Sequence, residues 1–397
     1  MIMKQHARPR LAICTNFVSP YRAPVFDALG EMGFDVRIFT DVDREADRGW
    51  DVIDRGQHFE TAQCRTWTRT KTVTLGDAPL RVESHVPWSL PAALQRFNPD
   101  CVISGECGVR SALASAWCKV NRRPLVIWTY HARNGRPKSN AVRRRVLGSA
   151  NAWVGMGTQA REVLIDEGCD DARIFDAPNA AAWDTIAARL EGTDFESQVA
   201  SCRDTADGRR LAIIVGRLIP MKGVDRMIDA WSVLPETVRE AWRLVVVGDG
   251  PMRAALEARA GDSAKFVGSV DAAMMPAWFS AADLHIFPSL SDPWGLVVNE
   301  AMQCGTPTLC STKAGCADDL VTDGEDGFLF DPTASTESVR DALVRSLTHA
   351  SLSSLGSRAA GRVLGFTPHR MALGMAEAVA SCRRIARVSS PMTEVHA

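Results

Sequence analysis

The sequence of 397 residues lacks features that define several protein classes. It has no apolar run close to the roughly 20 residues that a membrane-spanning helix needs. The apolar stretch after its charged start is also too short for the core of a signal peptide. We therefore expect a cytoplasmic location. The eleven cysteines form no C-x-x-C pair, which argues against a common zinc module and against a disulfide framework.

An excess of charge of either sign is lacking too, since 46 Lys and Arg residues stand against 47 Asp and Glu. This balance gives no overall field, so we expect no nucleic-acid partner. The charges are unevenly distributed, because residues 107–161 contain eleven Lys or Arg and no Asp or Glu. We expect one basic face in the first half, either a solvated surface or a docking surface for anionic lipid headgroups or a phosphorylated acceptor.

What is present is the pattern of a two-domain α/β protein. The length is about two to three times that of the commonest domain, and short runs rich in Val, Ile and Leu alternate with stretches of helical period. Six strands are expected in each half, at residues 11–16, 35–40, 100–104, 124–129, 152–155, 173–176, 211–215, 243–247, 265–267, 284–287, 306–310 and 327–330.

The domain junction is expected in the polar stretch 179–210, which has no strand signal. We place an N-terminal domain at residues 1–195 and a C-terminal domain at 205–366. A terminal helix is expected within 367–397, where Thr367 and Pro368 suit its first turn.

One informative segment is LAIIVGRLIPMKGVDRMIDAW at residues 211–231. A strand runs into Gly216, a loop carries Arg217 and Lys222, and Gly223 opens an amphipathic helix. Free N–H groups at a helix start, together with two cations, favour phosphate binding. Because the Gly-Lys-Ser/Thr run of a Walker loop is missing, the segment indicates either a diphosphate site of another kind or a loop with exposed cations.

The second informative segment is LHIFPSLSDPWGLVVNEAMQCGTPTL at residues 284–309. It predicts a strand, a loop and a helix that begins near Gly295 and ends at Gly305. Asp292 precedes this helix and Glu300 lies inside it among apolar residues, where a carboxylate is either an edge residue or a buried acceptor for donors such as sugar hydroxyls. Ligands bind beyond the carboxyl ends of strands in doubly wound sheets, so we expect this loop and the Arg217 loop at one site.

These segments resemble the retaining glycosyltransferases of family 4. Nearly all of the second domain is similar, in the family's order and at about its spacing, through GRLIPMKG, VVVGDGP, FVGSV, AADLHIFPS, DPWGLVVNEAMQCGTP and GEDGFLF. The first domain is similar mainly through TNFVSPYRAPVFDAL, WTYHARNG and APN. The resemblance implies a GT-B fold, in which two Rossmann-like doubly wound domains face a central cleft. It further implies that the first domain receives the acceptor, that the second binds the nucleotide-sugar, and that the terminal helix returns to the first domain.

The resemblance also implies roles for five residues. Arg217 and Lys222 match the basic pair that neutralises the donor diphosphate, and Glu300 matches the second acid of the E-x7-E motif, which accepts hydrogen bonds from the donor ribose. Asp292 replaces the first Glu and is one methylene shorter, which leaves the sugar open. His131 matches a histidine close to the transferred sugar. Further donor contacts are expected at Gly216, Gly248, Gly250, Val267, Gly268, Ser289, Trp294, Gly295 and Leu296, and acceptor contacts at Tyr21 and Arg22.

The implied activity is that of a hexosyltransferase (EC 2.4), which moves a sugar with retention from a UDP- or GDP-sugar to a polysaccharide or lipid-linked glycan. No cofactor and no metal are expected, and the basic stretch suggests peripheral contact with the inner membrane face. The base, sugar, acceptor, linkage and oligomeric state stay open. The alternatives are an inactive nucleotide-sugar-binding scaffold, which the replacement at Asp292 favours, a sugar-nucleotide epimerase of the same architecture, and an NAD-dependent oxidoreductase.

Two short patterns favour rival sites. Gly155, Gly157 and Ala160 follow a strand, with Asp176 near the distance of a ribose-binding acid, and so imitate a dinucleotide fingerprint, although late in the domain. The DVD at residues 41–43 imitates a D-x-D metal motif, for which a turn at a strand end is the simpler interpretation.

Overall fold

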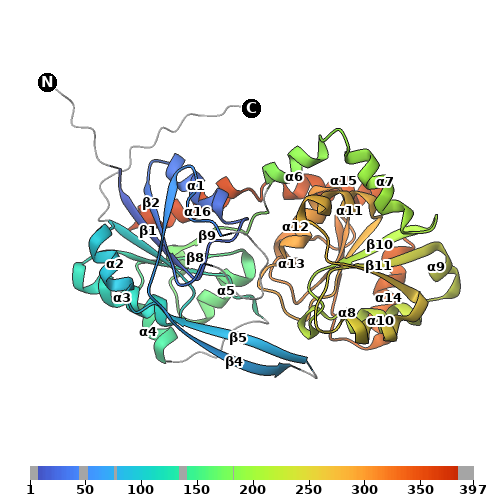
Figure 1. Cartoon of the computed structure of the whole chain (residues 1–397), viewed down its shortest axis with the longest axis horizontal. Helices are drawn as coiled ribbons and strands as arrows, with labels where there is room; N and C mark the ends of the chain where they lie inside the picture. The colour runs from blue at the N-terminus through green and yellow to red at the C-terminus, as the bar shows by residue number, and fades with distance from the viewer. Residues whose placement is uncertain (1–7, 44–51, 76–77, 134–140, 182, 383–397) are drawn as a thin grey trace.

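The computed structural model describes residues 8–43, 52–75, 78–133, 141–181 and 183–382. They form two α/β domains, each built on a parallel sheet with helices on both faces (Figure 1). The α/β class with two doubly wound sheets, as expected from the sequence, is confirmed.

The first sheet is buried on both faces. Along its central strand, Leu11 and Ile13 enter one hydrophobic core while Ala12 and Cys14 enter the core on the opposite face, as the two-residue period of a strand requires. The strand order reverses between β1 and β6. In spatial order the strands are β3 (Phe59–Gln63), β2 (Asp35–Thr40), β1 (Arg10–Thr15), β6 (Cys101–Gly105), β7 (Leu125–Thr129), β8 (Ala152–Gly155) and β9 (Ile174–Asp176).

The second sheet repeats this plan, with its own reversal between β10 and β13. On its central strand Ile213 pairs with Val245 on one side and His285 on the other. The loops that follow the two strands at the reversal therefore start next to each other, where α/β proteins bind ligands. In spatial order the strands are β12 (Ala264–Gly268), β11 (Trp242–Val247), β10 (Arg210–Val215), β13 (Leu284–Phe287), β14 (Thr308–Ser311) and β15 (Gly327–Phe330).

Helices cover the faces of both sheets, and most present an apolar side to the cores. The helices are α1 (Ala23–Glu31), α2 (Leu90–Phe97), α3 (Val109–Asn121), α4 (Ala141–Ser149), α5 (Thr158–Asp166), α6 (Trp183–Leu190), α7 (Phe195–Asp204), α8 (Val224–Ser232), α9 (Glu236–Ala241), α10 (Arg253–Ala260), α11 (Met275–Ala281), α12 (Leu296–Gln303), α13 (Ala317–Leu320), α14 (Thr336–Leu347), α15 (Leu352–Val363) and α16 (Pro368–Ser381).

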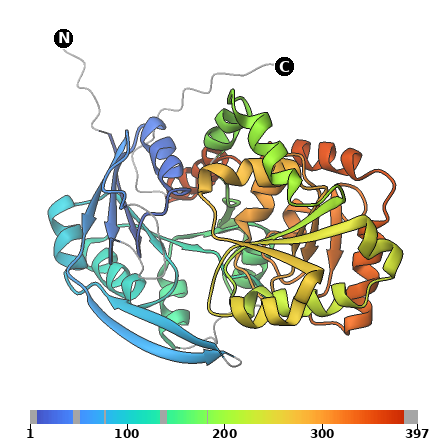
Figure 2. The ribbon, with the colours of Figure 1, turned by 45° about the vertical axis from the view of Figure 1, so that its right-hand side comes forward.

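The twelve expected strands are all present, with ends that differ from the expected ones by at most two residues. Three strands were not expected, namely β3, β4 (Trp67–Leu75) and β5 (Ala78–Val86). The last two form an antiparallel hairpin along the edge of the first domain (Figures 1 and 2). Its sequence alternates Thr with Arg and Lys and has no continuous apolar run, so no buried strand was indicated. The stretch 179–210 contains α6 and α7.

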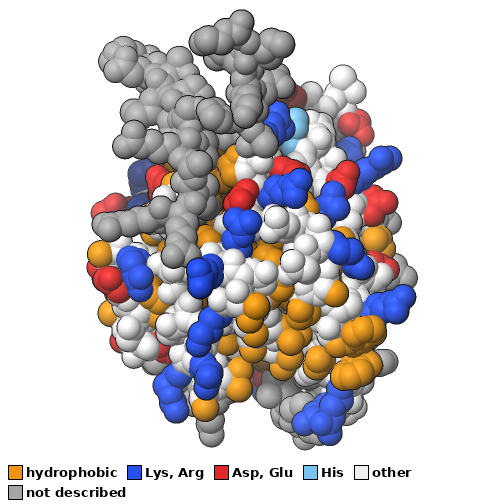
Figure 3. Space-filling model, turned by 90° about the vertical axis from the view of Figure 1, so that its left-hand side faces the viewer, with side chains coloured by type: hydrophobic (Ala, Val, Ile, Leu, Met, Phe, Trp, Pro, Cys, Tyr) orange, Lys and Arg blue, Asp and Glu red, His pale blue; other side chains and the backbone are white. Residues whose placement is uncertain are grey.

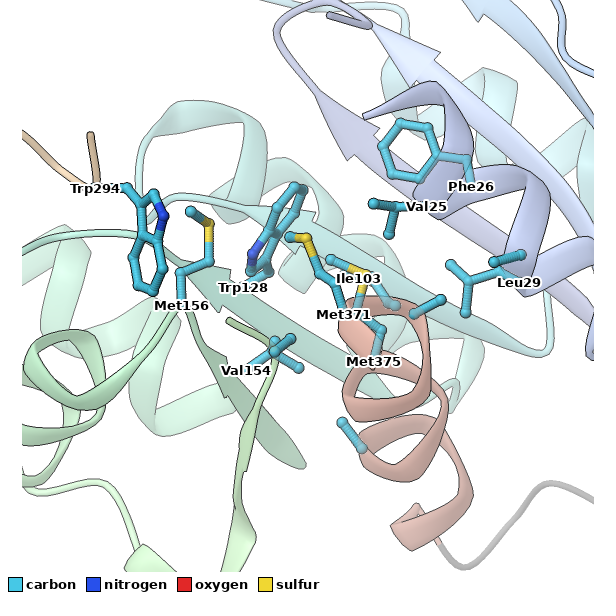
Figure 4. Close-up of a cluster of buried hydrophobic side chains, with 14 of the residues drawn as sticks. Val25, Phe26, Leu29, Ile103, Trp128, Val154, Met156, Trp294, Met371 and Met375 are labelled. Atoms are coloured by element: carbon cyan, nitrogen blue, oxygen red, sulfur yellow. The ribbon is translucent and has the colours of Figure 1, made fainter. Parts of the chain in front are cut away.

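The last helix packs on the first domain, although it follows the second in sequence. α16 contacts α1, β8 and β9, and its Met371 and Met375 lie in the core beside Trp128 (Figure 4). The same core extends to Trp294 of the second domain, so apolar side chains join the two domains. Within the described ranges no helix is both long and apolar enough to cross a bilayer.

Candidate active site

The loop after β10 carries the two expected phosphate-binding cations. Arg217 is half-buried in it, and Lys222 ends a short 3₁₀ turn, Pro220–Lys222. The Lys222 ammonium donates to Oδ2 of Asp292 at 2.6 Å and lies 5.4 Å from the centre of the Phe287 ring. Lys222 and Asp292, the first acid of the D-x7-E motif, therefore form an ion pair between loops that are 70 residues apart in the sequence.

Close backbone approach fixes this loop against the end of β11. The Leu218 amide donates to the carbonyl of Asp249 at 2.8 Å. Gly248 has a φ of +139°, and a Cβ there would overlap the carbonyl of Gly216, so both strand ends need glycine. Gly268, another residue expected to contact the donor, ends the adjacent strand β12, and its carbonyl accepts from the Gly248 amide at 2.8 Å. Two further residues expected to contact the donor lie close by in sequence, since Gly250 follows β11 and Val267 lies in β12.

The loop after β13 is tied to the same place. Ser289 is fully buried, and its hydroxyl donates to the carbonyl of Met221 at 3.2 Å, while the Leu290 amide donates to the same carbonyl at 2.8 Å. Gly295, with a φ of +99°, then turns the chain into α12 in a space where a Cβ would lie 2.7 Å from the Phe287 ring. α12 then starts at Leu296, four residues after the Asp292 carboxylate that bonds Lys222, and helix starts leave amide donors for an anion.

Glu300 lies on α12, one turn beyond its start. Burial raises the pKa of Glu300 from its ordinary 4.5 to about 7. A carboxyl group with this pKa is partly protonated at neutral pH, and it gains its full charge there only when donors such as sugar hydroxyls hydrogen bond to it. Glu300 can therefore accept hydrogen bonds from a polar ligand.

Trp294 connects the donor loop to the first domain. Its indole donates to the side chain of Asn299 at 2.8 Å, and its amide donates to Oδ1 of Asp292 at 3.0 Å. The ring is buried against Gly157, and Figure 4 shows it in a row with Met156 and Trp128. The loop that carries Asp292 is therefore in direct contact with the first domain.

The residues that were expected on the acceptor side follow strands of the first sheet, at its carboxyl edge. The guanidinium of Arg22 stacks on Trp128, with Cζ 4.1 Å from the ring centre, and Tyr21 lies beside it. His131 follows β7, and burial, with a smaller effect of Arg143, lowers its pKa to about 4. The imidazole is therefore neutral at pH 7 and has one N–H donor and one acceptor nitrogen.

Hydrogen bonds join the start of α5 in the first domain to residues 314 and 319 of the second domain. The Asp319 carboxylate accepts from the amide and the hydroxyl of Thr158, at 3.0 and 2.8 Å, and the Gln159 amide group donates to the carbonyl of Ala314 at 3.1 Å. These bonds occupy the start of α5. In the dinucleotide interpretation, the cofactor phosphate would bind at this helix start, where a carboxylate of the other domain now lies.

Charged residues in two of the segments noted in the sequence are paired inside the fold. Asp41 of the D-x-D pattern is 2% exposed and binds Arg110 through both oxygens, so it is an internal ion pair. Several arginines of the acid-free stretch are likewise paired with carboxylates from outside it, most deeply Arg143, which is 3% exposed and bonds Glu167 at 2.8 and 2.9 Å. The basic face is therefore smaller than the count of charges predicts, and Arg136 and Lys138 lie outside the described residues.

Two further residues at the site were not singled out from the sequence. Glu106 directly follows β6 and has a φ of +66°, a conformation that is uncommon for a non-glycine residue and often marks a functional site. Asp319 closes the domain contact. Glu106 could have been found from the sequence, because it is a carboxylate directly after a predicted strand. Asp319 could not, because its partner Thr158 is 161 residues away in the sequence.

Comparison with known proteins identifies the second domain. Residues 203–355 match the family described as glycosyl transferases group 1. The GDP-mannose-dependent alpha-mannosyltransferase of Mycolicibacterium smegmatis is 31% identical over 188 residues, which is 44% of this chain and 47% of that protein. Sulfoquinovosyl transferase SQD2 of Arabidopsis thaliana is 34% identical over 125 residues, or 31% and 24%. The chain thus spans less than half the length of either relative.

Solved structures match over nearly the whole chain. Sucrose-phosphate synthase from Thermosynechococcus elongatus has a TM-score of 0.70 at 18% identity and covers 93% of this chain and 98% of its own. Anabaena Alr3699/HepE, solved in complex with UDP, has a TM-score of 0.66 at 19% identity, with coverage of 94% and 100%. This likeness shows the fold, and the expected GT-B architecture is confirmed.

Proposed function

We propose that this chain, whose residues 203–355 match the group 1 glycosyl transferases, transfers a hexosyl group, with retention, from a UDP- or GDP-sugar to a polysaccharide or lipid-linked glycan. One observation carries this proposal. The loops after β10 and β13 bring Lys222, Asp292 and the start of α12 together at the carboxyl edge of the second sheet. Cations, an acid and helix amides at one point suit a diphosphate-linked sugar.

The mechanism follows from where charge develops. As the bond between the anomeric carbon and the phosphate oxygen breaks, negative charge grows on the terminal phosphate. Arg217, Lys222 and the amides of α12 stabilise it, and no metal is required for this role. The acceptor oxygen bonds the anomeric carbon on the same face, and its proton passes to the departing phosphate oxygen. No protein nucleophile takes part in this sequence.

The other polar groups position the donor. Asp292 releases Lys222 to the phosphate and accepts hydrogen bonds from the sugar hydroxyls, while Glu300 accepts those of the ribose. Neutral His131 contributes an uncharged hydrogen bond from the acceptor side, so it orients a hydroxyl without competing for the phosphate. The acceptor occupies the first domain near Tyr21 and Arg22.

Turnover tests this function directly. The purified chain is incubated with UDP- and GDP-sugars and with a panel of glycan acceptors, and release of the nucleoside diphosphate is measured. We expect release with one donor class and at least a hundredfold loss in Glu300→Ala, while Glu236→Ala on exposed α9 stays at the wild-type rate. Nucleotide-sugar binding without any turnover across the panel would support the scaffold alternative instead.

The same enzyme is proposed to contact an anionic bilayer at the cytoplasmic face. An open groove of about 1160 Å³ between α3 and α4 is lined by Lys119, Arg145 and apolar residues such as Val142. Val142 is 50% exposed, and Val120 on α3 is 82% exposed. Figure 3 shows hydrophobic side chains beside Lys and Arg on this side of the molecule. Lys119, Arg144 and Arg145 have no carboxylate partner among the residues that the structure describes. Apolar groups flanked by cations suit an anionic headgroup layer.

Vesicle flotation tests the contact. Changing Lys119, Arg144 and Arg145 together to Gln should weaken binding to phosphatidylglycerol-containing vesicles more than tenfold, since each juxtamembrane cation contributes about 1 kcal/mol. The matched variant Arg239→Gln/Lys265→Gln, on the second domain, should bind as wild type. Equal binding of both variants, or equal binding to pure phosphatidylcholine, would contradict the proposal.

A further inference from the structure

Arg22, which is half-buried, differs from the buried arginines of the first domain. Arg110 and Arg143 each bind a buried carboxylate through two oxygens. The guanidinium of Arg22 has no carboxylate within ion-pair distance among the described residues. Within the described part of the chain its buried Nε has no hydrogen-bond partner, and its Nη2 lies 3.6 Å from the sulfur of Met156.

An arrangement of this kind is costly unless a ligand completes it. Burial lowers the pKa of Arg22 from its ordinary value to about 10, and the charges of Tyr21 and Glu106 oppose this effect only in part. Uncompensated buried charges are strongly disfavoured. The stacking on Trp128 holds the guanidinium plane in place, so that its N–H edge is preorganised for a planar or tetrahedral anion.

The position of Arg22 places it opposite the donor loop. Met156, which it contacts, precedes Gly157, and the ring of Trp294 packs on Gly157. Figure 4 shows Trp294, Met156 and Trp128 in succession from the second domain into the first. An anion at Arg22 therefore belongs to the acceptor half of the site, whereas the donor phosphates belong to Arg217 and Lys222 across the domain contact.

We propose that Arg22 binds an anionic group of the acceptor, a phosphate or a carboxylate, close to the hydroxyl that receives the sugar. The inference that this anion is part of an acceptor rests on the proposed glycosyl transfer. The acceptor class is accordingly a phosphorylated or acidic glycan.

Calorimetric titration of inorganic phosphate, and of acetate in a separate arm, tests the site. The full chain is first saturated with UDP or GDP, so that the donor phosphate site is filled. We expect wild type to bind one of the two anions and Arg22→Gln to bind it at least tenfold more weakly, while Arg22→Lys keeps part of the affinity. The matched control is Arg173→Gln, because Arg173 also stacks on a tryptophan, with Cζ 4.8 Å from the Trp153 ring centre.

The outcomes separate this inference from the proposed function. Anion binding that is equal in wild type and Arg22→Gln, or absent from wild type, overturns the anion site. A loss of UDP or GDP affinity in Arg22→Gln overturns it as well, because Arg22 would then serve the donor. If wild type binds neither nucleotide, the proposed function itself fails. Should Arg22→Gln not fold, the comparison of wild type with Arg22→Lys decides, since unchanged affinity there contradicts a bidentate contact.

Discussion

Ionisation of Glu300 makes donor binding depend on pH. Its pKa in the ligand-free protein is about 7 because the group is buried, and hydrogen bonds from the ribose hydroxyls lower that pKa in the complex. Binding therefore displaces a proton below pH 7, so affinity rises with pH up to about 7 and is constant above it. With a pKa of 7 the ionised fraction grows about tenfold between pH 6 and pH 8, equivalent to roughly 1.4 kcal/mol of binding free energy.

Isothermal titration of UDP or GDP at pH 6, 7 and 8 measures this change. The terminal phosphate of the nucleotide titrates in the same range, so the comparison is with Glu300→Gln, which keeps the shape and removes the ionisable group. Wild-type affinity should rise about tenfold relative to the variant, with matching proton release in buffers of different ionisation enthalpy. Parallel pH profiles for the two proteins would refute the role of Glu300 as the ribose acceptor.

Three further predictions follow from the charged contacts. Arg143→Ala removes the guanidinium that bonds the buried Glu167 carboxylate at 2.8 and 2.9 Å and should lower the free energy of unfolding in urea by about 3–5 kcal/mol. Exposed Arg145→Ala should change it by no more than about 0.5 kcal/mol, and equal effects would contradict the buried pair. Asp319→Ala removes the carboxylate that caps α5 across the domains and should cost about 1 kcal/mol, seen as a lower midpoint of thermal unfolding, and an unchanged midpoint would speak against that contact. Asp292→Asn frees Lys222 from its ion pair, so calorimetry should show tighter binding of the nucleoside diphosphate alone while sugar transfer falls; weaker nucleotide binding would show that the pair supports the site.

The sequence predicts the sheets well because buried parallel strands are continuous apolar runs. Ile13 and Ile213, for example, lie in such runs and occupy the two central strands. The β4–β5 hairpin has polar alternation instead and was missed. Loop motifs predict where Lys222 and Asp292 belong, but their 2.6 Å ion pair depends on two loops meeting in space. For the same reason a count of charges overestimated the basic face, since carboxylates such as Glu167 come from elsewhere in the chain.

The central claim is that the second domain holds a nucleoside diphosphate at Lys222. The most direct measurement is the thermal shift of the purified chain with UDP, GDP, ADP and NAD, repeated with Lys222→Ala and with the exposed control Lys265→Ala. A ligand at a hundred times its dissociation constant adds about 2.7 kcal/mol of apparent stability. The account predicts a shift with UDP or GDP that is lost in Lys222→Ala and kept in Lys265→Ala. A shift with NAD alone, or one that survives in Lys222→Ala, would contradict it.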